Sequence, residues 1–213
     1  MSSQTPTLEV IKAAAKKVEG LVHNTPLLTC KTINDMFRAE IFFKCEYLQK
    51  AGAFKSRGAC IAVFSLSDEQ IARGVGTHSS GNHAQALARA AKLRNANAYI
   101  VMPETAQQVK INAVKYYGGR ITFCKPTLES RETTLNELIN NNSALEIHPY
   151  NDHRIIAGQA TAALEILNEI ADLDIIMAPV GGGGLLSGTA LATKYISPET
   201  RVIACLLYTS DAA

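Results

Sequence analysis

Ile175-Ile176-Met177-Ala178-Pro179 is a continuous apolar run, followed after Val180 by four glycines and then by helical spacing over residues 185–195. An apolar strand that passes through glycines into a helix lets the backbone approach a phosphate closely, with the N–H groups of the helix N-terminus directed at it. A tight strand-to-helix turn is the alternative, but such a turn needs only one or two glycines. The run lacks both the G-x-G-x-x-G pattern of dinucleotide sites and the Gly-Lys-Ser/Thr of a Walker loop. It therefore predicts a phosphate cradle of another kind, formed by Gly181, Gly182, Gly183 and Gly184.

Strands and helices alternate along the rest of the chain. Short segments that we expect to be strands are separated by segments with helical spacing. The expected strands are 41–45, 75–78, 98–102, 120–124, 145–148, 175–179 and 201–204, and the expected helices are 8–19, 57–66, 82–93, 107–117, 128–140, 155–170 and 185–195. This alternation predicts an α/β fold with a parallel sheet and helices on both faces.

The composition argues against several classes of protein. Of the 213 residues, 47% are hydrophobic and 19% are charged, and the net charge is +2. These values are typical of a globular protein, and they favour neither a nucleic-acid nor a membrane partner. The 5 cysteines are scattered without a C-x-x-C pair. We therefore expect free thiols in a cytoplasmic protein rather than disulfides or a zinc site.

A lysine stands in the segment Ala53-Phe54-Lys55-Ser56-Arg57-Gly58, at the start of an expected helix. The positive end of that helix and the nearby Arg57 should both disfavour the ammonium form of Lys55, and partial burial would add to this effect. A neutral amine is what Schiff-base formation needs, whereas a solvated surface lysine is the alternative. A lysine amine together with a phosphate cradle is what pyridoxal phosphate (PLP) requires.

A second strand-to-helix turn is Ser79-Ser80-Gly81-Asn82-His83. Free N–H groups at the start of its helix would suit a carboxylate, Ser80 offers a hydroxyl, and Asn82 offers an amide. His78 and His83 have no third potential metal ligand nearby. We therefore expect each of them to be a packed or capping histidine rather than part of a metal site. The turn also lacks the first glycine of the Gly-x-Ser-x-Gly pattern of serine hydrolases.

In chain order, as 53–58, 79–83 and 181–184, the three segments resemble the serine racemase and serine/threonine dehydratase family, the fold-type II PLP enzymes related to the tryptophan synthase β subunit. The resemblance runs over about residues 8–204. It is also carried by Asn24-Thr25-Pro26-Leu27, Phe43-Lys44-Cys45-Glu46, Gln49-Lys50, Pro103-Glu104-Thr105-Ala106, Glu129-Ser130-Arg131-Glu132, His148-Pro149 and Ala157-Gly158-Gln159.

The resemblance implies a role for each site residue. Lys55 would be the Schiff-base lysine, residues 181–184 the phosphate cradle, and Phe54 a side chain packed on the cofactor ring. Asn82 would bond the ring oxygen, and Ser79, Asn82 and His83 would hold the substrate carboxylate. Arg131 would close over the substrate, and Gln85 and Tyr117 would contact a nucleotide effector.

The resemblance also implies a reaction. Lys55 would take the α-proton of serine from one face, and Ser80 would return a proton on the other face, which gives racemisation. Departure of the β-hydroxyl would instead give β-elimination of serine or threonine to a 2-oxo acid and ammonia. Racemase-like relatives carry serine at the position of Ser80. Ala51 stands where relatives often carry a hydroxyl residue, and Tyr150 is more like the aromatic residue of the dehydratases. A threonine or 3-hydroxyaspartate dehydratase without racemase activity is therefore the alternative.

The resemblance divides the chain into a large PLP-binding domain (1–74 and 150–204) and a small inserted α/β domain (75–149). The tail 205–213 matches nothing in the family, and we expect the large domain to be incomplete. Relatives carry a divalent-cation site and a pyridine-nitrogen partner in a further stretch, so we name no metal ligand here; we expect a homodimer when the protein is full length. An inactive truncated fragment and a Rossmann-type nucleotide-binding module in which Lys55 is incidental are the two remaining hypotheses.

Overall fold

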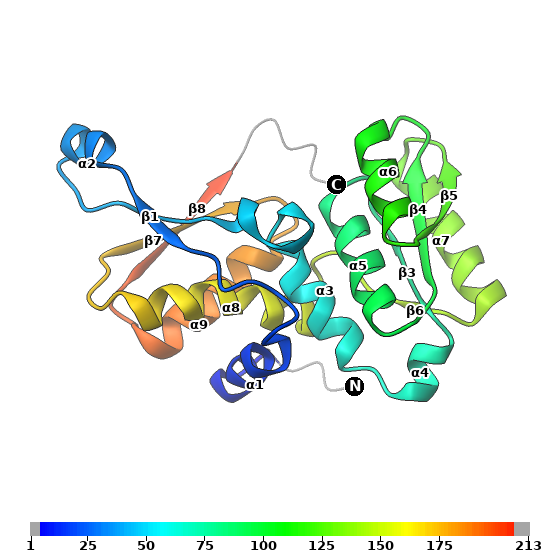
Figure 1. The fold of residues 1–213 in the computed structure, drawn as a ribbon, viewed down its shortest axis with the longest axis horizontal. Helices are drawn as coiled ribbons and strands as arrows, with labels where there is room; N and C mark the ends of the chain where they lie inside the picture. The colour runs from blue at the N-terminus through cyan, green and yellow to red at the C-terminus, as the bar shows by residue number, and fades with distance from the viewer. Residues whose placement is uncertain (1–4, 207–213) are drawn as a thin grey trace.

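The computed structural model describes residues 5–206, and its central feature is a four-stranded parallel sheet. The sheet runs in the order β5-β4-β3-β6 and carries α5, α6 and α7 (green in Figure 1). Its strands are β3 (Val75–His78), β4 (Ala98–Pro103), β5 (Arg120–Cys124) and β6 (Leu145–Glu146), and its helices are α5 (Asn82–Leu93), α6 (Gln108–Tyr116) and α7 (Leu128–Asn142).

Helices cover both faces of this sheet, as predicted. Side chains alternate along a strand, so neighbours on β4 point to opposite faces. Ile100 belongs to the core cluster that contains Leu87 of α5, whereas Val101 belongs to the cluster that contains Leu135 of α7. The near-continuous burial of β3 and β4 follows from this double covering.

The remaining segments pack beside this sheet (Figure 1). Two small sheets lie there: β7 (Ile175–Val180) pairs in parallel with β8 (Arg201–Leu206), and β1 (Leu27–Thr29) pairs antiparallel with β2 (Phe42–Lys44). The helices are α1 (Leu8–Val18), α2 (Lys31–Phe37), α3 (Lys55–Phe64), α4 (Asp68–Ala72), α8 (His153–Glu169) and α9 (Gly184–Ile196), with 3₁₀ turns η1 (Glu46–Leu48) and η2 (Lys50–Gly52).

Several sequence-based boundaries need correction. The prediction of one parallel sheet is incomplete, because β2 pairs antiparallel with β1, a strand the sequence analysis missed. The strand expected at 145–148 ends at Glu146, and the one expected at 201–204 continues to Leu206, where it pairs with Val180. Residues 207–213 of the predicted tail lie outside the described residues.

The predicted domain division stays a prediction. Residues 75–146 supply every strand of the four-stranded sheet. The largest core cluster nevertheless joins Cys60 and Val63 of α3 to Leu87 and Ala91 of α5. Among residues 5–206, no helix is both long and apolar enough to cross a bilayer.

A buried charge cluster fixes α3. The Arg57 side chain is 0% exposed and makes two-pronged hydrogen bonds to Glu46, with N···O distances of 2.9 and 2.7 Å, and to Glu165, with 2.6 and 2.8 Å. Lys44 Nζ lies 2.7 Å from the second Glu165 oxygen. Such planar pairing suits guanidinium, and it ties α3 to η1 and α8.

We expect Arg57→Met to destabilise the protein by about 3 kcal/mol, because it leaves the mostly buried carboxylates of Glu46 and Glu165 with Lys44 as the remaining cation. Urea unfolding measures this loss. Lys31→Met is the control, because the pair between Lys31 and Asp35 is exposed and should contribute less than about 1 kcal/mol. Equal stability losses in the two variants would contradict the assigned role of Arg57.

Candidate active site

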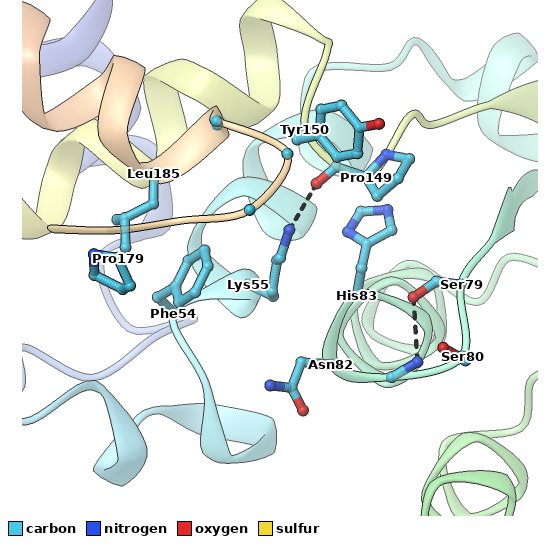
Figure 2. Close-up of a pocket in the computed structure, with 15 residues that line it drawn as sticks. Phe54, Lys55, Ser79, Ser80, Asn82, His83, Pro149, Tyr150, Pro179 and Leu185 are labelled. Carbon is cyan, nitrogen blue, oxygen red and sulfur yellow. Dashed lines mark hydrogen bonds between the residues drawn. The ribbon is translucent and has the colours of Figure 1, made fainter. Parts of the chain in front are cut away.

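A cavity of about 330 Å³ lies where three predicted segments meet. Figure 2 shows Lys55 between the glycine loop (residues 181–184), the Pro149-Tyr150 turn and the start of α5. The cavity is lined by Phe54, Lys55, Ser79, Ser80, Gly81, Asn82, His83, Pro149, Tyr150, Pro179, Gly181, Gly182, Gly183, Gly184 and Leu185.

Lys55 is the first residue of α3, and its amine is directed into the cavity (Figure 2). Nζ donates to the carbonyl oxygen of Pro149 at 2.9 Å and lies 5.3 Å from the centre of the Phe54 ring. Burial lowers the pKa of Lys55 to about 8. About a tenth of this amine is therefore neutral at pH 7, far more than for an ordinary lysine, and the neutral form is the nucleophile.

The reason for the lowered pKa of Lys55 agrees with the prediction in part. We expected the helix end and Arg57 to disfavour the ammonium form, with partial burial adding to their effect. Burial is the cause, whereas the Arg57 charge is neutralised within the cluster of Glu46 and Glu165. Arg57 therefore affects Lys55 through the placement of α3 rather than through its charge.

The glycine loop follows β7 and leads into α9, as predicted. Gly183 has a φ of +88°, and a Cβ on Gly182 would lie 2.1 Å from the Tyr150 ring, so these two positions are glycine for structural reasons. A Cβ on Gly181, by contrast, would meet nothing within 4 Å, and Gly181 has no positive φ. The fold alone thus does not require glycine at 181, whereas a ligand seated at the start of α9 would.

We expect Gly181→Ala to weaken PLP binding by at least about tenfold while leaving the unfolding temperature unchanged, because the added methyl group fills open space beside the loop. Gly182→Ala is the comparison, since its methyl group must displace Tyr150 and should lower stability as well. Fluorescence titration with PLP and thermal unfolding give the two quantities. Unchanged PLP affinity in Gly181→Ala would contradict the cradle assignment.

The turn between β3 and α5 places Ser79, Ser80, Asn82 and His83 along the cavity (Figure 2). The N–H of Gly81 donates to Ser79 Oγ at 3.3 Å. α5 begins at Asn82, so the N–H groups of its first turn have no partner within the helix. This arrangement is suited to an anion such as a carboxylate.

His83 is 2% exposed, and its imidazole is neutral. Burial, followed by the nearby charge of Lys55, lowers the pKa of His83 to about 3. Its Nε2 lies 3.3 Å from the Ile147 carbonyl oxygen, which only accepts, so Nε2 carries the proton. Nδ1 is then an acceptor, and it has no hydrogen-bond partner among the described residues. The side chain of His83 therefore cannot donate to a carboxylate, although its backbone N–H can.

The other predicted residues lie outside the cavity lining. Gln85 is buried; its Nε2 donates to the Ala51 carbonyl oxygen at 2.8 Å and to Asn82 Oδ1 at 3.2 Å. Tyr117 packs edge-to-face on Tyr116 at the end of α6. Arg131 lies in α7, and its buried Nε has no partner among residues 5–206.

Pro149 and Tyr150 were missed as lining residues. The Tyr150 ring packs against Gly182 and meets the His148 ring edge-to-face at 4.5 Å. Their position could have indicated this role, because both residues follow the carboxyl end of a parallel strand, and ligand sites of parallel sheets lie at such ends.

The whole arrangement fits PLP. The cavity combines a buried amine of lowered pKa, a glycine position left open by the fold, and a helix N-terminus. The amine is a nucleophile for an aldehyde, and the open glycine position with the helix N-terminus is a seat for a phosphate.

Comparison with known proteins gives consistent results. The model of the pyridoxal-phosphate dependent enzyme family matches residues 18–212. The chain is 51% identical to serine racemase from Dictyostelium discoideum over 94% of this chain and 62% of that protein. It is 48% identical to beta-hydroxyaspartate dehydratase from Paracoccus denitrificans, over 93% of this chain and 63% of that protein.

Solved structures agree with this relationship. The crystal structure of the Dictyostelium discoideum serine racemase superposes with a TM-score of 0.92 at 50% identity, covering 96% of this chain and 67% of that one. The processed form of threonine deaminase isoform 2 from Solanum lycopersicum superposes with a TM-score of 0.87 at 32% identity, covering 97% of this chain and 58% of that one. The chain spans about three-fifths of the length of the curated relatives it matches. The chain belongs to the pyridoxal-phosphate dependent enzyme family, within the fold-type II group that includes serine racemases and threonine deaminases.

Proposed function

We propose that the protein containing this chain uses PLP to racemise serine and to eliminate the β-hydroxyl group of serine. The observation that carries this proposal is that Lys55 and Ser80 line the same cavity, beside the glycine loop. When bound, PLP supplies an electron sink for the substrate Cα. The protein must then hold the cofactor, orient the amino acid and move protons.

The glycine loop and the N-terminus of α9 would hold the phosphate, and Phe54 would pack on the ring. Lys55 would anchor the aldehyde carbon until substrate displaces it. The substrate carboxylate would lie at the start of α5, where Ser79 and the backbone N–H groups of Asn82 and His83 are available. Binding there would place the α-hydrogen of the substrate within reach of Lys55.

Proton transfer decides the product. Lys55, released from its covalent role, would take the α-proton at Nζ, as a base whose pKa lies near the working pH. Ser80 is half-buried and lines the same cavity from the turn that precedes α5 (Figure 2), and its Oγ would exchange a proton on the other face of Cα. If Ser80 returns a proton to Cα, the product is the D-amino acid. If serine loses its β-hydroxyl group before a proton returns, the products are pyruvate and ammonia.

A dehydratase acting on threonine or 3-hydroxyaspartate without racemisation is the second candidate. It is favoured by the 48% identity with beta-hydroxyaspartate dehydratase and by Tyr150, which lines the cavity and resembles the aromatic residue of the dehydratases. The two candidates share Lys55, the glycine loop and the start of α5. They differ in whether Ser80 transfers a proton.

Three further properties rest on the family resemblance: a homodimer, a nucleotide effector near Gln85 and Tyr117, and a divalent cation. A cytoplasmic location rests on the scattered cysteines. Among residues 5–206, no group of three His, Cys, Asp or Glu side chains is placed to hold a metal ion. We therefore propose the cation without assigning ligands to it.

The test is to incubate the PLP-loaded protein with L-serine and to assay D-serine by chiral chromatography and pyruvate in the same sample. We expect both products. Pyruvate without D-serine, together with faster 2-oxo acid formation from L-threonine or 3-hydroxyaspartate, would favour the dehydratase. Formation of neither product from any of the three amino acids would contradict both candidates.

A further inference from the structure

The side-chain amide of Asn82 has a defined orientation. Asn82 Oδ1 accepts a hydrogen bond from Lys110 Nζ at 2.7 Å and from Gln85 Nε2 at 3.2 Å. A lysine ammonium group has only donors, so the Asn82 atom that faces it must be the oxygen. The surrounding hydrogen bonds thus decide which way the amide points. Asn82 lines the cavity, and the group that it can direct into the cavity is therefore Nδ2, which has two N–H donors.

We propose that Lys110 is a positioning residue that acts through Asn82 and makes this part of the cavity a hydrogen-bond donor. The inference rests on the proposed function, because the acceptor it implies is the ring oxygen of PLP. With the amide turned the other way, Asn82 would present its own oxygen and would repel that acceptor. Lys110 itself does not line the cavity.

Three elements create this arrangement. Lys110 lies in the first turn of α6, which packs beside the start of α5. Gln85 lies one turn beyond Asn82 on α5, where a residue three positions away shares the helix face. Gln85 also bonds the carbonyl oxygen of Ala51, which has a left-handed φ of 56° just before the segment that carries Lys55. The Asn82 oxygen is thereby held from two sides.

The charge of Lys110 has a second effect. A hydrogen bond from an ammonium group is stronger than one between neutral groups, and hydrogen bonds in a chain polarise one another. Electron density drawn toward Oδ1 makes the Nδ2–H groups better donors. Asn82 would therefore favour the ionised form of a ring oxygen over the protonated form.

A merely structural role for Lys110, in which it only pins α6 to α5, is the competing explanation. The chain contains a matched control in Lys92, which joins the same two helices at their C-terminal ends. Lys92 Nζ donates to the Tyr116 carbonyl oxygen at 3.4 Å and lies 5.5 Å from the Tyr116 ring centre, away from Asn82. Replacing either lysine removes one positive charge and one contact between α5 and α6.

The experiment compares PLP titrations of wild type, Lys110→Met and Lys92→Met. We expect Lys110→Met to bind PLP about tenfold more weakly and to shift the pH at which the bound chromophore changes its absorbance, whereas Lys92→Met should match wild type in both. Lys110→Arg should recover part of the affinity, because it restores a cationic donor. Wild-type affinity in Lys110→Met, or an equal loss in Lys92→Met, would overturn the inference.

Asn82→Asp supplies a sharper test. The carboxylate keeps acceptors for Lys110 and Gln85 but offers the cavity no donor, so we expect at least about a tenfold loss of PLP affinity. Wild-type or tighter binding would show that the cavity uses the oxygen instead, and would overturn the inference.

The failure of this inference is distinguishable from the failure of the proposed function. Wild-type protein that does not bind PLP would contradict the proposed function. The orientation of Asn82 is measurable without PLP, from the side-chain amide signals of Asn82 in the NMR spectrum of isotope-labelled protein. The chemical shifts of these signals should change in Lys110→Met and stay the same in Lys92→Met. Unchanged chemical shifts in Lys110→Met would overturn the inference.

Discussion

Replacing Lys55 with alanine is expected to abolish the covalent attachment of PLP and to lower serine turnover by about 10⁴-fold, which is the upper end of the loss for one acid–base group. The large effect follows because Lys55 would serve both as the attachment point and as the base. Its amine is directed into the cavity, and the lowered pKa of Lys55, about 8, makes it a competent nucleophile near neutral pH. Absorbance of the bound cofactor and assay of both products measure the loss.

The pH dependence of attachment supplies an additional check on Lys55. Only the neutral amine attacks an aldehyde, so the rate of attachment should rise as the pH is raised through about 8 and level off above it. Lys31→Ala, which removes an exposed lysine from α2, should leave both attachment and turnover unchanged. Covalent attachment that survives Lys55→Ala would contradict the assignment.

Replacing Ser80 with alanine is expected to lower D-serine formation by about 10²–10⁴-fold while lowering pyruvate formation far less. The reason is geometric, because Lys55 serves one face of Cα and Ser80 is the group proposed for the other. Both products are assayed in one reaction, so a general loss of folding or of cofactor affects them equally and cancels in their ratio. An unchanged ratio would assign Ser80 to substrate binding instead.

Much of the site could be predicted from local sequence because its parts are strand-to-helix turns. At the glycine loop and at Ser79–Gly81, a short strand changes to helical spacing through small residues, and both turns lie at carboxyl ends of parallel strands. Ligand sites of parallel sheets gather at such ends. The presence of Ser80 and Gly181 in one cavity therefore followed from the alternation of strands and helices.

The other features of the fold and of the site could not be predicted, because they depend on contacts between residues far apart in the sequence. Arg57 pairs with Glu165, 108 positions away, and no local pattern indicates that its charge is neutralised there. The packing of Tyr150 on Gly182 is likewise long-range, as is the antiparallel pairing of β1 with β2. β1 has only 3 residues, too few for a periodic signal. The tautomer of His83 depends on the Ile147 carbonyl oxygen, 64 positions away.

The most direct test of the central claim, that this chain holds PLP on Lys55, is borohydride reduction of the PLP-loaded protein followed by peptide mapping. Reduction converts a lysine-bound cofactor into a stable secondary amine. The account predicts one labelled peptide, with the phosphopyridoxyl group on Lys55. Label on Lys44 or Lys50, or protein that takes up no label after loading, would contradict it.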